Sequence, residues 1–424
     1  MKSRIAVKSA IALFGATALA LAGCASGSPG ETGAGGGETA AAERGPITFA
    51  MGANDTGKLV PIIEAWNAEH PDEEVTLSEL PQEADQQRET LVQSLQANSG
   101  DYDVMALDVT WTAEFAANGW LQPLEGDLAL DTTGLLPATV DSATYMGTLY
   151  AGPQNTNAQL LYYRTDLVDK APATWTELID SCGAAEEAGV DCLVLQLKNY
   201  EGLTVQTTQA INANGGAVVD EDGSTPLVEE AGAKAGLQSL VDAYAAGEIA
   251  QRTDSFTEEE TNLAFVGGES MYAYNWPYMY DNAGAEESQV KGNFEVAPIV
   301  GPDGPGASTL GGYNNGINMF SEYKATALDF IKFVQSEENQ KSFAEQSFPP
   351  VLASVYEDSA LIEQFPYLPT LKDALDTAQP RPVTPYYAAI SKAIHDNAYA
   401  AITAGKSVDD AMADMAAAIR NAAA

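Results

Sequence analysis

Basic residues are scarce in this sequence. The 424-residue chain has 20 Lys and Arg against 60 Asp and Glu, a formal net charge of −40. Nucleic acids and anionic membrane surfaces attract basic proteins, so this excess of acid argues against both as partners. It favours a neutral or cationic ligand, although an acidic surface also serves solubility.

Histidine and cysteine are nearly absent, with two His and three Cys. His70 and His395 stand far apart, and no group of Cys, His and carboxylates has the spacing of metal ligands. We therefore expect no metal site and no cofactor. Cys182 and Cys192 are ten residues apart, which in an exported chain favours a disulfide. The alternative is a pair of separate buried thiols.

Long apolar runs are confined to the start of the chain. Three basic residues in 1–8 precede an apolar segment at 11–21, and LAGC follows at 21–24. This is the layout of a secretory signal, and the run is short for a transmembrane anchor, which is the alternative. LAGC resembles the lipobox of bacterial lipoproteins. That resemblance implies a signal peptide at 1–23, a lipid (palmitate) on Cys24, and attachment to the outer face of the cytoplasmic membrane.

The rest of the chain reads as a tether followed by α/β structure. Residues 24–45 are rich in Gly, Ala, Ser, Thr and Glu and lack hydrophobic periodicity, which indicates a flexible tether. Strands and helices then alternate in a β-α-β-α-β order, predicted at 47–51, 59–66, 75–77, 84–97 and 102–107, with a helix at 111–119. Pro61 is expected in the first turn of its helix. This order predicts a parallel sheet with helices on both faces.

The middle of the chain predicts a second unit of the same kind. Strands are expected at 158–163, 270–274 and 294–300, and helices at 233–244, 325–343, 386–402 and 407–419. Capping boxes at 174–177 and 257–260 open two more helices. With no Gly-rich linker between the units, we expect two lobes that share the chain: lobe I at 46–155 and 317–354, lobe II at 156–316 and 355–424. Ligands of open parallel sheets bind beyond the carboxyl ends of the strands, so facing lobes make a cleft.

Five segments are similar, in order, to those of the extracellular sugar-binding proteins of ABC importers, and the likeness covers nearly all of 46–421. They are DYDV at 101–104 with Asp108 and FAANGWLQPL at 115–124; GTLYAGP at 147–153 with LYYR at 161–164; FVGG at 265–268 with NWP at 275–277; GGYNNGI at 311–317; and RPVTP at 381–385. QQR at 86–88 and the segment 104–115 carry a narrower likeness to trehalose- and maltose-binding lipoproteins.

The resemblance implies a periplasmic-binding-protein-like type II fold, with two α/β lobes, a ligand cleft and hinge crossings. It implies a monomer that binds a disaccharide or small oligosaccharide in the cleft and delivers it to the permease subunits of an ABC importer. It implies no catalysis.

A sugar presents hydroxyl groups and flat C–H faces, so its site needs carboxylates, amides and Arg for the first and aromatic rings for the second. The residues expected to bind the ligand are Asn54, Asp55, Gln87, Asp108, Asn155, Asn157, Glu258, Trp276, Tyr278, Gly312, Tyr313 and Arg381.

Several of these residues have a purely structural alternative. Asn54, Asp55 and Asp108 are suited to capping helices. Gln87 fits a solvated helix face, Trp276 fits core packing, and Arg381 fits a surface loop. Glu260 suffices as the acid of its capping box, which leaves Glu258 for the cleft.

Two other functions fit parts of the same pattern. An exported glycoside hydrolase would use Asp108 and Glu258 as its carboxylate pair, and the sequence does not give their separation. A surface adhesin would explain the tether and the acidity but not the cleft motifs. A binding test that also looks for turnover separates the hydrolase from the receptor.

Overall fold

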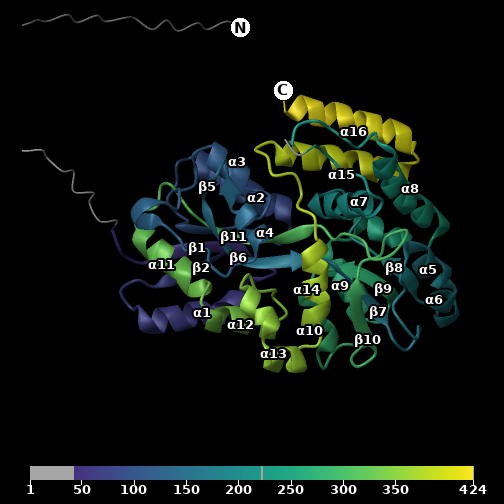
Figure 1. The fold of residues 1–424 in the computed structure, drawn as a ribbon, viewed down its shortest axis with the longest axis horizontal. Coiled ribbons are helices and arrows are strands. Elements are labelled where there is room, and N and C mark those ends of the chain that lie inside the picture. The colour runs from purple at the N-terminus through teal and green to yellow at the C-terminus, as the bar shows by residue number, and fades with distance from the viewer. Residues whose placement is uncertain (1–42, 221–222, 424) are drawn as a thin grey trace, which may run out of the picture. The chain divides into compact units, whose positions relative to one another are not determined.

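The computed structural model describes residues 43–220 and 223–423, all of which belong to one unit of the chain, Ala42–Ala424. The predicted signal peptide (1–23), the lipidation site Cys24 and most of the tether (24–45) lie outside the described residues. Among the helices described, none is long and apolar enough to cross a bilayer. Figure 1 shows two groups of strands within this unit, each surrounded by helices.

The first sheet has the strand order β2-β1-β3-β11-β6. Its strands are β1 (Ile47–Gly52), β2 (Val75–Leu80), β3 (Val104–Asp108), β6 (Ala151–Ala158) and β11 (Leu310–Ile317). β1 pairs in parallel with β2 and β3, as the β-α-β-α-β pattern predicts. The side chains of β3 alternate between two cores: Val104 and Ala106 join one, and Met105 and Leu107 join the other. The sheet is therefore buried on both faces.

Helices cover both faces of the first sheet, and we call this assembly the first lobe. Its other elements are α1 (Thr56–Glu69), α2 (Ala84–Gln96), α3 (Thr112–Ala117), α4 (Pro137–Ser142), the hairpin β4 (Thr144–Tyr145) and β5 (Thr148–Leu149), α11 (Lys324–Val334) and α12 (Glu337–Glu345). The single long helix predicted over 325–343 is wrong. The chain leaves α11 at Gln335, and the Ser336 side chain accepts a hydrogen bond from Asn339 N to begin α12.

The second sheet has the order β10-β7-β9-β8, and it anchors the second lobe. Its strands are β7 (Leu160–Arg164), β8 (Asp191–Val194), β9 (Ser270–Asn275) and β10 (Phe294–Pro298). The helices of this lobe are α5 (Trp175–Asp180), α6 (Cys182–Ala188), α7 (Glu201–Ala213), α8 (Ala231–Ala246), α9 (Glu258–Val266), α10 (Tyr278–Gly284), α13 (Ser359–Gln364), α14 (Leu368–Thr377), α15 (Tyr387–Ala404) and α16 (Val408–Ala422). In Figure 1, α15 and α16 lie beside α7 and α8.

Each sheet contains one strand that runs against the others. β11 is antiparallel to both β3 and β6, and β7 is antiparallel to both β9 and β10. The prediction of a parallel sheet is therefore wrong for β7, and β11 was not predicted as a strand. β7 follows β6 with only Gln159 between them, so the chain enters the second sheet without a crossover helix. Parallel neighbours in one sheet need such a crossover connection. β11 likewise arrives in the first sheet from β10 of the second.

These crossings join the lobes. β6 and β11 pair with each other and run across two of the predicted lobe boundaries, 155/156 and 316/317. The boundaries themselves stay a prediction.

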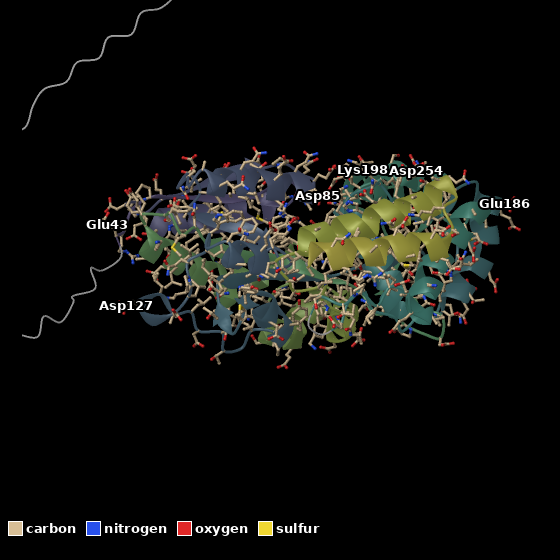
Figure 2. The ribbon with its side chains drawn as sticks, turned by 90° about the horizontal axis from the view of Figure 1, so that it is seen from above. Glu43, Asp85, Asp127, Glu186, Lys198 and Asp254 are labelled. Atoms are coloured by element: carbon tan, nitrogen blue, oxygen red, sulfur yellow. A yellow bond between two sulfur atoms is a disulfide. The ribbon has the colours of Figure 1, made fainter. Side chains whose placement is uncertain are left out.

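The predicted disulfide is present between Cys182, the first residue of α6, and Cys192 in β8. Cys192 is buried in the core of the second lobe, so the bond ties a surface helix to a central sheet. Figure 2 shows the acidic side chains of Asp127 and Glu186 at the periphery of the unit.

Candidate functional site

A cavity of about 690 Å³, counted with the space open to solvent at its mouth, is lined by residues of both lobes. That volume lies within the range of small-molecule sites. The lining residues are Asn54, Asp55, Gln82, Ala84, Gln87, Asp108, Asn157, Glu201, Val205, Glu258, Trp276, Tyr278, Gly311, Gly312, Tyr313, Phe348 and Arg381. The cavity therefore brings together every predicted ligand residue except Asn155.

The first lobe contributes its side chains from the ends of parallel strands. Asn54 and Asp55 follow β1, and Asp108 is the last residue of β3, which pairs in parallel with β1. Asp55 occupies the N-cap position of α1, but its side chain makes no capping hydrogen bond. Asp108 accepts from the backbone N–H of Thr110 at 3.0 Å and from its hydroxyl at 2.8 Å, both through Oδ1. Oδ2 makes no hydrogen bond within the described residues.

Arg381 connects the two lobes inside the cavity. Its guanidinium donates to Asp108 Oδ1 at 2.9 Å and to Glu201 Oε1 at 2.6 Å, and the residue is only 3% exposed. The alternative of a surface loop is wrong for this residue. Because the side chain is buried and bonded to carboxylates on both sides, its position is fixed.

Glu201 was missed by the sequence analysis. It is the first residue of α7 and also accepts hydrogen bonds from the hydroxyls of Tyr387 and Ser391. Burial raises the pKa of Glu201, and Arg381 opposes that rise. No sequence signal marked this residue, because the strand and helix that place it, β8 and α7, were not predicted.

Trp276 follows β9 and lies against the backbone of β11. A methyl group added at Gly311 would approach Trp276 Cζ3 to 2.9 Å and Cη2 to 3.0 Å. The glycine therefore makes room for the indole ring. Trp276 is half-buried, and both it and Tyr278 line the cavity, which leaves ring surface available to a ligand.

The neighbouring glycine has a different role. Gly312 has φ +120°, and a methyl group there would lie 2.3 Å from the carbonyl oxygen of Asn155 in β6. Only glycine tolerates both conditions. The register between β6 and β11 shifts just beyond it, between Tyr313 and Asn314, at the point where Tyr313 faces the cavity.

Gln87 is buried, not solvated, so that alternative is wrong. It is 1% exposed and packs on Gly52, where a methyl group would approach its amide nitrogen to 2.3 Å. Its amide donates to the carbonyl of Gln82 at 3.0 Å. Its Oε1 is buried and has no partner among the described residues, and the residue lines the cavity.

Glu258 faces the cavity from the start of α9. The predicted capping box is confirmed between Thr257 and Glu260, and this leaves the Glu258 carboxylate to accept from Tyr200 Oη at 2.6 Å. Burial raises the pKa of Glu258, while the hydrogen bonds from Tyr200 and Trp276 lower it. Glu258 O also accepts a hydrogen bond from the Tyr278 hydroxyl at 3.1 Å.

Asn155 lies in β6 but does not reach the cavity. Its side chain is buried within the sheet, where Oδ1 accepts from Gln154 Nε2 at 3.3 Å. Asn155 is the register partner of Tyr313 and lies on the same face of β6 as Asn157, so burial of its side chain, not strand alternation, keeps it out of the cavity. Asn157, two residues on, does line the cavity.

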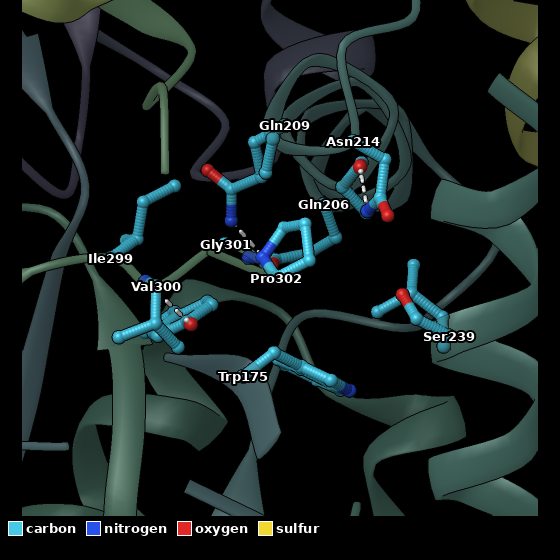
Figure 3. Close-up of a pocket in the computed structure, with 13 residues that line it drawn as sticks. Trp175, Gln206, Gln209, Asn214, Ser239, Ile299, Val300, Gly301 and Pro302 are labelled. Carbon is cyan, nitrogen blue, oxygen red and sulfur yellow. Dashed lines mark hydrogen bonds between the residues drawn. The ribbon is translucent and has the colours of Figure 1, made fainter. Parts of the chain in front are cut away.

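A second cavity, of about 440 Å³, lies within the second lobe (Figure 3). Its walls come from α7, α8 and the segment after β10, with Trp175 below and Gln209 above in this view. Gln209 donates its two amide hydrogens to Gln159 and Gln206. No carboxylate or basic group lines this cavity, so it offers none of the charged hydrogen bonds that hold a sugar. No cluster of described side chains is suited to holding a metal ion.

The chain is similar to known proteins in both sequence and structure. Residues 52–341 match the family model of bacterial extracellular solute-binding proteins. A "Probable ABC transporter-binding protein" of Deinococcus radiodurans is 31% identical over 360 residues, covering 80% of this chain and 84% of the relative.

Two solved structures resemble the described unit closely. The maltose-bound MalE3 of T. maritima has a TM-score of 0.84 at 33% identity, covering 89% of this chain and 99% of that one. The GacH receptor of Streptomyces glaucescens, solved unliganded and with acarbose, has a TM-score of 0.80 at 25% identity, covering 90% and 98%. The predicted type II periplasmic-binding-protein fold is confirmed by these matches.

Proposed function

We propose that this chain, which belongs to the bacterial extracellular solute-binding protein family, binds a disaccharide, trehalose or maltose-like, between its lobes. It is a solute-binding protein of an ABC importer and not an enzyme. We further propose that a lipid on Cys24 keeps it at the outer face of the membrane, and that it passes the sugar to the permease as a monomer.

The observation that carries this proposal is the mixture of groups around the cavity. Carboxylates and amides on both lobes suit hydroxyl groups, and Trp276, Tyr278 and Tyr313 supply aromatic surface for sugar rings. The similarity to the maltose-bound MalE3 and to a receptor solved with acarbose supports a sugar of two or more rings. Trehalose rests only on the sequence likeness at 86–88 and 104–115.

Release would need the lobes to separate. The chain passes between them through β6 and β7 and returns through β11, so we propose that the lobes open and close about these crossings. Opening would break the bond between Arg381 and Asp108, since Asp108 belongs to the first lobe and Glu201, the other partner of Arg381, to the second.

The experiment compares two tryptophans. Trp276→Ala removes a ring from the proposed sugar site, and Trp175→Ala removes a half-buried ring from the second cavity. We expect Trp276→Ala to weaken calorimetric binding of the sugar roughly 5- to 30-fold. Trp175→Ala should leave it unchanged. The site is misassigned if Trp175→Ala gives the larger loss.

A further inference from the structure

The charges around the sugar cavity are unbalanced. Four of its lining residues are acidic, namely Asp55, Asp108, Glu201 and Glu258, and Arg381 is its single basic residue. A carboxylate removed from water is unfavourable unless a positive charge or several hydrogen-bond donors face it. Each of the four therefore needs a partner.

Arg381 serves only two of them. Its guanidinium donates to Asp108 at 2.9 Å and to Glu201 at 2.6 Å, and no bond joins it to Asp55 or Glu258 within the described residues. The Asp55 carboxylate accepts a single hydrogen bond within the described residues, from its neighbour Asn54 at 3.2 Å, and the residue is 9% exposed. Asp55 and Glu258 thus come from different lobes to one cavity. Among the described residues no cation donates a hydrogen bond to either carboxylate, although Glu258 accepts one from Tyr200 Oη.

The nearest lysines are occupied elsewhere. Lys58 Nζ donates to the carbonyl of Gln346 at 2.7 Å and lies 3.7 Å from the Asp281 carboxylate. Lys198 is bonded to the Glu83 carboxylate and lines a neighbouring pocket that shares Glu258 with the cavity. Neither ammonium group donates to Asp55 or Glu258.

Asp55 is faced by charged groups of α1 and α9 and by two tyrosine hydroxyls. Lys58 of α1 is the single cation, Glu258 and Glu259 of α9 are acidic, and the hydroxyls of Tyr278 and Tyr313 complete the set. Burial raises the pKa of Asp55 to about 7, with Lys58 opposing and the two glutamates adding to the rise. A neutral sugar would donate hydroxyl hydrogen bonds to these acids but would bring no positive charge.

We propose that, among sugars of the size the cleft binds, it prefers one that carries a protonated amino group directed at Asp55 and Glu258. This inference rests on the proposed function, because it assumes that a sugar occupies the cavity. A metal ion is not the missing charge, since the described residues include no group suited to hold one. An ammonium group donates up to three hydrogen bonds and serves both carboxylates at once.

The test uses the purified full chain and a panel of compounds. The disaccharide that binds best is compared by calorimetry with derivatives in which one hydroxyl at a time is replaced by an amino group. Near neutral pH, we expect one derivative to bind at least about tenfold more tightly than the parent sugar, as a charge-assisted hydrogen bond in a buried site would give.

Two variants locate the effect. Asp55→Asn should reduce the ratio of amino-sugar to parent affinity towards one. Asp127→Asn, which removes the same charge from an exposed residue outside the cavity, should leave the ratio as it is. Equal reductions in both variants would overturn the proposal, because the preference would then reflect overall charge.

The failures of the two proposals are distinguishable. If the parent sugar binds and no amino derivative binds more tightly, the preference is wrong and sugar binding stands. If neither parent sugars nor their amino derivatives bind, the proposed function is wrong, and the preference falls with it.

Discussion

A methyl group at position 311 should weaken sugar binding without harming the fold. In Gly311→Ala the new carbon would lie 2.9 Å from Trp276 Cζ3 and 3.2 Å from Asn157 Cβ. Carbon atoms prefer separations of about 3.5–4.0 Å, so the indole ring must move by roughly 0.5–1 Å. The backbone at Gly311 is not left-handed, so alanine fits its conformation.

The magnitude follows from what the ring contributes. If the displaced ring loses most of its contact with the sugar, affinity should fall by about 1–2 kcal/mol, or roughly 5- to 30-fold. Calorimetry measures that loss, and thermal unfolding without ligand should change little. Gly312→Ala is the contrasting variant: its methyl group would lie 2.3 Å from a backbone oxygen at φ +120°, so we expect about 2 kcal/mol or more of lost stability.

A double-mutant cycle can refute this reasoning. If Gly311→Ala acts only through the ring, it should cost no further affinity in a chain that already carries Trp276→Ala. An undiminished loss in that background would show that the methyl group acts on something other than Trp276. The account of the glycine would then be wrong, whatever the effect of the single variant.

Three further outcomes are expected. Glu201→Ala should weaken sugar binding more than Glu201→Gln, since glutamine still accepts from Arg381, and titrations of both variants check this. Replacing Cys182 and Cys192 by serine should lower the free energy of unfolding by about 2–3 kcal/mol in denaturant melts. Neutral-sugar affinity should fall as pH rises from about 4 towards 7 and then level off. Burial in this structure raises the pKa of Asp55 to about 7, so forming this buried arrangement takes up a proton, and Asp55→Asn should flatten that profile.

Most of the sugar cavity was predictable because its residues follow recognisable strands and motifs. Asp108 ends an apolar strand, Trp276 sits beside a proline, and Arg381 lies between two prolines. The resemblance to sugar-binding proteins supplied the roles. Asn155 shows the limit of that approach: the strand containing it was not predicted, so neither was the burial of its side chain within the sheet.

Helix α7 and Glu201 were missed for a physical reason. Nearly every residue of α7 from Glu201 to Gln209 is buried, although most of them are polar. A helix buried on all sides has no amphipathic stripe, so hydrophobic periodicity gives no signal. Thr204, Gln206 and Gln209 donate tertiary hydrogen bonds that the local sequence does not encode. The hydroxyls of Thr207 and Thr208 have no partner among the described residues.

Strands β6 and β11 escaped prediction because of their composition. Their sequences, AGPQNTNA and LGGYNNGI, are rich in Gly and Asn, which are depleted in strands. They pair with each other and carry the chain between the lobes, so tertiary contacts decide their conformation.

Pro61 was expected in the first turn of its helix, but α1 begins at Thr56, which puts the proline inside it.

The measurement that tests the central claim most directly is a calorimetric titration of the purified chain with trehalose and maltose, followed by analysis of each sample for hydrolysis products. The account predicts saturable binding of one of these sugars, with a dissociation constant near micromolar (about −8 kcal/mol) and no product. Release of glucose, or the absence of binding to either sugar and to a wider disaccharide panel, would contradict it.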